Sequence, residues 1–231
     1  MSSRARTGLV VGALLAGVLY LAGLASDHFW LRLCAKPWPI LALIATLSAA
    51  SGPRQERAPY PRWIVRGLWL CLLGDLLLEE RDKLFLPGVL AFLAGHVCYL
   101  VAYTSADRRL RPLLALPFGL WGAGLFLHLR PGLGHMTIPL AVYTCVLCAM
   151  MWRAAALHGG EALGKRAALL AAGGALLFGI SDSLIALNRW GGGIPHARYA
   201  IITLYWVGQA GITGSALGKA ETGSGGARRT T

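Results

Sequence analysis

The sequence predicts an all-α polytopic membrane protein, a bundle of about eight transmembrane helices. Of its 231 residues, 56% are hydrophobic and only 14% are charged, whereas soluble domains carry about 25% charged residues. Most of its apolar stretches reach the ~17 residues needed to cross the hydrocarbon core. They lie at 8–25, 37–50, 63–78, 84–104, 111–128, 136–157, 167–187 and 199–217. Little sequence remains for a soluble domain, so any chemistry takes place among the helices.

The two ends of the chain and the second stretch need separate comment. The first stretch follows Arg4 and Arg6 like a signal peptide, but it lacks an Ala-x-Ala-like site and seven further stretches follow. We therefore expect a retained helix. The second stretch is short, and Pro37 is expected to form its first turn, which places Lys36 at the end of the span. Residues 1–220 are expected to form a single domain, and the Gly/Ser/Thr/Arg-rich residues 221–231 a disordered cytoplasmic tail.

The basic residues predict the topology. Alternate connections, beginning with the N-terminus, hold 15 of the 22 Lys and Arg residues, and the other connections hold seven. The positive-inside rule then places both termini in the cytoplasm, in agreement with an even number of spans. We expect a multi-pass protein of a bacterial inner membrane. The net charge of +12 is spread over the connections, so it does not indicate a nucleic-acid partner.

Two carboxylates lie inside apolar stretches. Asp75 occurs in the run Trp69–Leu78 and Asp182 in the run Leu169–Leu187. An ionised Asp at membrane depth costs at least ~2.5 kcal/mol on insertion scales, so such residues usually face a protein-lined or wet cavity. Both are expected in the outer half of their spans, together with Lys36. A site that uses both carboxylates is therefore predicted there.

Other polar residues share helical faces. His96, Tyr99 and Tyr103 are spaced i, i+3, i+7, and Tyr205 and Gln209 are four residues apart. Each of these residues can belong to the site or can simply hydrogen-bond neighbouring helices. Lys36 has a similar alternative, because a basic residue at the end of a span commonly extends to the headgroups.

The sequence gives no indication of a metal or cofactor. Cys145 and Cys148 form a CxxC within an apolar stretch, without a second pair or a nearby His, which is more typical of packing than of a metal or redox site. No HxxxH or similar ligand spacing occurs.

Six short motifs, taken together and in order, resemble the YhhN-like family, which includes the eukaryotic lysoplasmalogenases. The resemblance covers roughly residues 30–215. The motifs are Cys34-Ala35-Lys36-Pro37, Leu73-Gly74-Asp75, the run FLAGHVCY at 92–99, Tyr143, the run GALLFGISD at 174–182, and the run YWVGQ at 205–209.

The resemblance implies hydrolysis of the vinyl ether bond of lysoplasmalogens, to a fatty aldehyde and glycerophosphoethanolamine or glycerophosphocholine. A vinyl ether is cleaved by protonation of its β-carbon, and water then captures the oxocarbenium ion. One protonated and one ionised carboxyl group suit this chemistry, and burial favours the protonated form. Asp75 and Asp182 are the catalytic candidates, and either can be the acid. Expected substrate contacts are Lys36, His96, Tyr99, Tyr143 and Gln209.

Two alternatives of other classes stay open. A small proton-coupled transporter or carrier would use Asp75 and Asp182 as protonation sites. A structural or lipid-binding membrane protein would perform no chemistry. The expected partners are the bilayer and a single-chain phospholipid, and the sequence does not predict an oligomeric state. Release of an aldehyde by the purified protein separates the enzyme from both alternatives.

Overall fold

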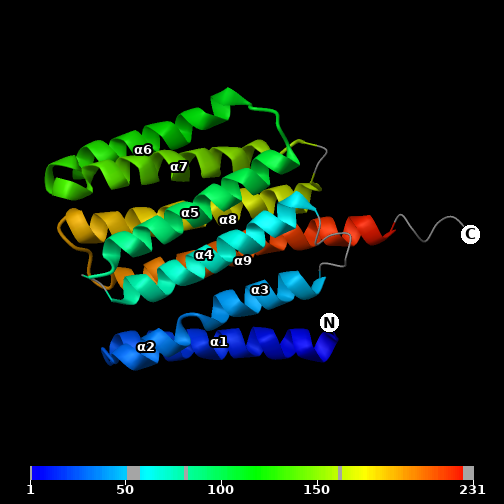
Figure 1. Ribbon diagram of the computed structural model, residues 1–231, viewed down its shortest axis with the longest axis horizontal. Coiled ribbons are helices and arrows are strands. Elements are labelled where there is room, and N and C mark those ends of the chain that lie inside the picture. Colours follow the sequence, from blue (N-terminus) through cyan, green and yellow to red (C-terminus); the bar gives the residue numbers. More distant parts are fainter. Residues whose placement is uncertain (1, 51–57, 81–82, 161–162, 226–231) are drawn as a thin grey trace, which may run out of the picture.

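The computed structural model describes residues 2–50, 58–80, 83–160 and 163–225, and their regular structure is entirely helical (Figure 1). Three short 3-10 turns, at Pro112–Ala115, Arg130–Gly132 and Gly134–Met136, flank α6 and precede α7. The helices are α1 (Ser3–Ala25), α2 (Phe29–Ala35), α3 (Trp38–Ala50), α4 (Pro59–Glu79), α5 (Phe85–Ala106), α6 (Leu116–Leu129), α7 (Thr137–Ala156), α8 (Lys165–Trp190) and α9 (Ala197–Gly225).

The prediction of a polytopic helical bundle is confirmed. Within the described residues, seven segments are long and apolar enough to cross a membrane, one of them formed by α2 and α3 together. Helix α4 has 21 residues and adds an eighth long helix, with Asp75 and Glu79 in its apolar half. Large apolar side chains such as Leu14, Leu120 and Ile138 are 66–76% exposed. Such outward-facing apolar surface suits a lipid environment.

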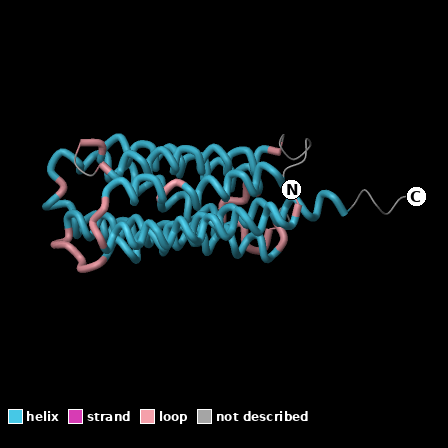
Figure 2. The backbone as a smooth tube through the Cα atoms, turned by 90° about the horizontal axis from the view of Figure 1, so that it is seen from below, coloured by secondary structure: helices cyan, strands magenta, loops and turns pink. Residues whose placement is uncertain are grey.

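The helices run nearly parallel in a flat bundle (Figures 1 and 2). Across the bundle, α1 contacts α3, and α3 contacts both α4 and α9. Helix α4 packs on α5, and α9 packs on α8. Helix α7 lies against α5 and α8, and α6 lies beyond α7. Both termini lie at one end (Figure 1), as expected for an even number of crossings. We call the opposite end the far end. Helix α9 continues to Gly225, and the rest of the tail expected at 221–231 lies outside the described residues.

The second span differs from its prediction. It extends from Phe29 to Ala50 and not from 37 to 50, because α2 precedes α3 with only a local interruption at Lys36 and Pro37. The backbone continues through it, since the Lys36 amide donates to Arg32 and the Leu41 amide to Pro37. Proline removes one helical donor here without ending the span. Lys36 is therefore buried well inside the span, and the prediction that it lies at the span's end is wrong.

Glycines allow close packing of the two helix pairs that carry Asp75 and Asp182. A Cβ at Gly174 of α8 would lie 2.6 Å from the Ile212 amide of α9, and a Cβ at Gly208 would lie 2.9 Å from the Gly174 carbonyl oxygen. The backbones of α8 and α9 can approach this closely only because both residues lack a side chain. On α4, Gly74 plays the same part beneath the ring of Phe92 from α5. Close packing of these pairs fixes the positions of Asp75 and Asp182.

Candidate active site

Asp75 lies one turn before the end of α4 and contacts side chains of α9 and of the α2–α3 junction. The hydroxyl group of Tyr205, from α9, donates a hydrogen bond to its Oδ2 at 2.6 Å. The ammonium group of Lys36 lies 3.6 Å from Oδ1 and donates to the Asp75 carbonyl oxygen at 3.0 Å. The side chain is buried. Burial favours the neutral form of a carboxyl group and a nearby ammonium the ionised form, so Lys36 and Tyr205 offset part of the cost of burying an ionised Asp75.

Asp182 lies about two turns before the end of α8 and has different neighbours. The hydroxyl group of Tyr143, from α7, donates to its Oδ2 at 2.5 Å. The imidazole Nε2 of His96 is 3.6 Å from the same oxygen, outside normal hydrogen-bonding distance. His96 is fully buried, packed edge-on against Tyr143 and Phe178, and neither ring nitrogen has a hydrogen-bond partner among the described residues. No Lys or Arg of the described residues forms an ion pair with Asp182.

Both carboxylates line one cavity at the far end, which we call the polar chamber. Its volume is about 310 Å³, room for several water molecules or a small polar group. Residues from α1, the α2–α3 junction, α4, α5, α8 and α9 enclose it. The lining includes Tyr20, Lys36, Asp75, Leu78, Glu79, Phe85, Phe92, Ser181, Asp182, Ile185, Asn188, Arg189, Arg198, Ile201, Ile202 and Tyr205.

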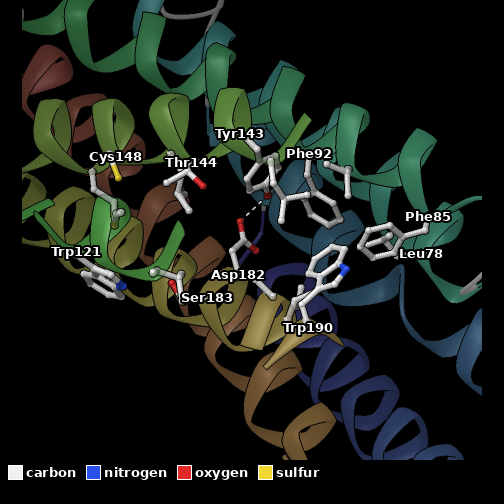
Figure 3. A pocket seen from close by; sticks show the side chains of 18 residues that line it. Leu78, Phe85, Phe92, Trp121, Tyr143, Thr144, Cys148, Asp182, Ser183 and Trp190 are labelled. Atoms are coloured by element: carbon white, nitrogen blue, oxygen red, sulfur yellow. Dashed lines mark hydrogen bonds between the residues drawn. The ribbon is translucent and has the colours of Figure 1, made fainter. Parts of the chain in front are cut away.

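A second, smaller cavity of about 70 Å³ runs between α5, α6, α7 and α8, with Asp182 in its lining; we call it the apolar cleft. Figure 3 shows Asp182 near its middle, joined to Tyr143 by a hydrogen bond, with Phe85, Phe92 and Trp190 on one side and Trp121 and Cys148 on the other. Beside these, it is lined by Leu78, Val89, Gly122, Leu125, Leu140, Thr144, Leu147, Met151, Ser183, Ile185 and Ala186. Asp182 thus borders an apolar and a polar cavity at once.

A buried ionic cluster forms one wall of the chamber. Glu79 accepts from the Arg32 Nε at 2.7 Å, the Arg198 Nη2 at 3.2 Å and the Lys36 Nζ at 3.4 Å. Buried charges of this kind persist only when paired. Lys36 therefore belongs to the cluster and does not extend to the membrane surface.

Two expected substrate contacts lie elsewhere. The Tyr99 hydroxyl donates to Gln209 Oε1 at 2.7 Å, and both side chains are fully buried and line neither cavity. They lie one turn beyond His96 and Tyr205 along α5 and α9, toward the termini. We reassign this pair to the packing of the core, because nothing that occupies the cavities would touch them. The other three expected contacts, Lys36, His96 and Tyr143, adjoin the carboxylates.

Four side chains beside the carboxyl groups are absent from the predicted catalytic residues and substrate contacts. The spacing of Tyr205 left open whether it belongs to the site or bonds a neighbouring helix, and in the structure it donates to Asp75. Glu79 follows Asp75 by one turn in the sequence, whereas Arg32 and Arg198 are among the basic residues of the connections. The ion pairs of Glu79 with Arg32 and Arg198 span 47 and 119 residues of sequence. Only the helix spacing of Glu79 gave a usable signal.

No group of three or more His, Cys, Asp or Glu side chains in the described part of the chain is arranged to hold a metal ion. Cys145 and Cys148 lie on α7 as free thiols, the first exposed and the second partly buried. The Cys148 thiol donates to the Phe118 carbonyl oxygen at 3.1 Å, a packing contact between α6 and α7.

Comparison with known proteins identifies the family. The model of the YhhN family matches residues 31–216. The chain belongs to the YhhN family. The matched segment begins in α2 and ends in α9, so it contains both aspartates, Lys36 and the whole ionic cluster around Glu79. Helix α1, which contributes Tyr20 to the chamber, lies outside the matched segment.

Several curated relatives of this YhhN-family chain carry an enzyme name. Lysoplasmalogenase TMEM86B of Homo sapiens is 32% identical over 190 residues, which cover 81% of this chain and 76% of that protein. Lysoplasmalogenase TMEM86A of Bos taurus is 32% identical over 203 residues, or 85% and 82%. A lysoplasmalogenase of Mycobacterium tuberculosis (strain CDC 1551 / Oshkosh) is 32% identical over 158 residues, or 64% and 58%. No solved structure matches the chain.

Proposed function

We propose that this chain is an integral-membrane lysoplasmalogenase, which hydrolyses the vinyl ether bond of a lysoplasmalogen to a fatty aldehyde and glycerophosphoethanolamine or glycerophosphocholine. The relatives' names support the reaction. The observation that carries the proposal is the position of Asp182, a buried carboxyl group at the boundary between the apolar cleft and the polar chamber. A lysoplasmalogen has its reactive bond at the same kind of boundary, between one long chain and a polar headgroup.

The two cavities suggest how the substrate binds. The alkenyl chain occupies the apolar cleft, where burial of each methylene contributes about 0.8 kcal/mol. The glycerol and phosphate occupy the polar chamber, and the vinyl ether lies beside Asp182. A free sn-2 hydroxyl group fits the chamber, whereas a second acyl chain would have to enter it, which favours single-chain lipids. With both termini in the cytoplasm, the chamber lies toward the outer side of the membrane.

Asp182 is the acid in this mechanism. It lies among apolar groups of α5, α7 and α8 and has no Lys or Arg partner in the described part of the chain, and such surroundings favour a neutral carboxyl group. It transfers its proton to the β-carbon of the vinyl ether. The α-carbon and the ether oxygen then share the positive charge of an oxocarbenium ion. Tyr143 orients the carboxyl group through its hydrogen bond of 2.5 Å.

Asp75 is the base. Lys36 and Tyr205 keep its carboxylate ionised and fixed at the wall of the chamber. It accepts a proton from water as the water oxygen bonds to the α-carbon, which gives a hemiacetal. The hemiacetal loses its hydroxyl proton to the departing glycerol oxygen as the carbon–oxygen bond breaks, and the aldehyde is released. Chamber water returns the proton from Asp75 to Asp182, so both carboxyl groups are restored.

The decisive experiment is aldehyde release by the purified protein in detergent, with matched substrates. The lysoplasmalogen should be cleaved, and the saturated alkyl ether with the same headgroup should bind and inhibit without reaction, because it cannot form the oxocarbenium ion by carbon protonation. Cleavage of the ester analogue at the rate of the vinyl ether would instead indicate an acyl hydrolase. A proton-coupled carrier would release no aldehyde, and it would show substrate uptake in sealed vesicles.

A further inference from the structure

The ionic cluster around Glu79 has no task in the acid–base steps beyond holding Lys36 beside Asp75. Glu79 is buried and accepts hydrogen bonds from three cationic side chains, at 2.7 Å from Arg32, 3.4 Å from Lys36 and 3.2 Å from Arg198. One carboxylate with one ammonium would suffice to hold Lys36. The two additional guanidinium groups therefore point to another role for this wall of the chamber.

The three cations differ in how many acceptors they already have. Arg32 is only 9% exposed, and besides Glu79 it donates to the Gly23 carbonyl oxygen and to Asp27. Lys36 is equally buried and lies between the Asp75 carbonyl oxygen, the Asp75 carboxylate and Glu79. Arg198 is 27% exposed, lines the chamber, and donates to Glu79 through Nη2, its one acceptor within the described residues. Its remaining donors are available to a ligand.

The surroundings of Arg198 favour an anion. The three cations of the cluster pair with three carboxylates, of which Asp75 and Glu79 are buried whereas Asp27 is 89% exposed and screened by water. Positive charge therefore exceeds negative charge on the chamber side of the cluster, and this excess attracts an anion. Arg198 lies in the first turn of α9, whose N-terminal end carries a partial positive charge. A guanidinium group also matches two phosphate oxygens at once, which an ammonium group does not.

We propose that Arg198 binds the phosphate group of the substrate, and that Glu79 is a positioning residue that fixes the guanidinium group at the chamber wall. The assignment rests on the proposed function, and it gives the phosphate to Arg198 and not to Lys36, which is one of the expected substrate contacts. Lys36 lies beside the Asp75 carboxylate and stabilises the ionised form of this base. Among single-chain vinyl ether lipids, the site accordingly binds those that carry a phosphate group more tightly than those that lack it.

The test compares two vinyl ether substrates on the same enzyme: 1-alkenyl-glycerophosphoethanolamine and 1-alkenyl-glycerol, which lacks the phosphate. Arg198→Gln should raise KM for the phospholipid about 10- to 100-fold, the usual effect of losing a hydrogen bond to a charged group. Its kcat, and its KM for the alkenyl glycerol, should stay close to the wild-type values. Arg198→Lys should restore part of the preference, because it keeps the charge without the paired donors.

Arg130→Gln is the matched control, because Arg130 is an exposed arginine at the same end of the bundle that lines neither cavity. It should leave the preference unchanged. Glu79→Gln should weaken the preference, and Glu79→Asp should restore it in part. The ratio of the two KM values does not depend on the fraction of folded enzyme, so partial misfolding of a variant does not hide the result.

The outcomes separate this proposal from the proposed function. If wild-type protein releases aldehyde from neither substrate, the proposed function is wrong. If it cleaves both and Arg198→Gln keeps the wild-type KM ratio, the reaction stands and the phosphate assignment is overturned.

Discussion

The apolar cleft and the polar chamber share part of their lining, including Asp182, and they differ in the helices that each one adds to it. The apolar cleft adds α6 and α7, and Asp182 is the one residue with a carboxyl group among the described residues that line it. The polar chamber adds α1, the α2–α3 junction and α9, and its charged side chains come from that junction, α4, α8 and the start of α9. Under the proposed function, one bundle binds both halves of an amphiphile, because the helices that line only one of the two cavities make that cavity apolar or charged. The proposed chemistry takes place at Asp182, which lines both cavities.

The largest expected effect follows from removing either carboxyl group. Asp182→Asn and Asp75→Asn preserve size and keep a hydrogen-bond acceptor for Tyr143 and Tyr205, so both variants should insert and fold. Each should lose about 10²- to 10⁴-fold in kcat, the usual contribution of a general acid or base. Aldehyde release by monodisperse protein is the measurement. A variant that retains near-wild-type turnover removes its residue from the mechanism.

The second prediction concerns stability and tests the ionic nature of the chamber wall. Lys36→Met leaves Asp75 and Glu79 facing each other without the ammonium group between them. Removal of one partner of a buried ion pair costs about 3–5 kcal/mol, so thermal unfolding in detergent should begin at a clearly lower temperature.

The double variant Lys36→Met/Glu79→Gln is the control for that prediction. It should lose less stability than the sum of the two single variants, because the residues interact directly at 3.4 Å. An unchanged unfolding temperature for Lys36→Met would mean that this lysine is not held in the cluster.

The third prediction compares the tyrosines that serve the two carboxyl groups. Tyr143→Phe and Tyr205→Phe each remove one hydrogen bond, of 2.5 Å and 2.6 Å, to Asp182 and Asp75. We expect roughly a tenfold loss or more in kcat from Tyr205→Phe, since a hydrogen bond to an ionised group contributes about 1.5–3 kcal/mol. The loss from Tyr143→Phe should be smaller, since a hydrogen bond to a neutral carboxyl group contributes about 0.5–1.5 kcal/mol. Tyr103→Phe is the matched control, because the Tyr103 hydroxyl is buried without a partner among the described residues. Equal losses in all three variants would point to a general packing effect.

The smallest expected effect lies in the apolar cleft. Val89→Trp adds bulk to its lining, so KM should rise by about tenfold for a long alkenyl chain, within the ~1–3 kcal/mol that overpacking costs. A substrate with a short chain should be affected less. Leu90→Trp is the control, because Leu90 follows Val89 in the chain but is 49% exposed and lines neither cavity. The same KM change for both chain lengths would contradict the assignment of the cleft to the chain.

Local sequence features predicted the bundle, its long helices and the position of Asp75 and Asp182 inside apolar helices. Apolar composition and helix length are properties of single segments, so they can be read without the packing. The depth of Lys36 was not predicted correctly. Pro37 normally indicates the beginning of a helix, whereas here the chain continues through it by hydrogen bonds on either side. The partners of Glu79 were out of reach for another reason. Arg32 and Arg198 come from distant helices, and their positions depend on how α1 to α4 and α9 pack.

The central claim, that Asp182 protonates a vinyl ether carbon, has one direct test. The purified protein is supplied with lysoplasmalogen in D₂O, and the aldehyde is reduced to the alcohol as it forms, before its α-hydrogens exchange with solvent. NMR of a chiral ester of this alcohol then gives the configuration at the deuterated carbon next to the former aldehyde carbon. Protonation by Asp182, which is fixed on one side of the vinyl ether, predicts one deuterium atom there in a single configuration. Equal amounts of the two configurations would contradict the mechanism, because the carbon would have received its deuterium from free solvent and not from a positioned carboxyl group.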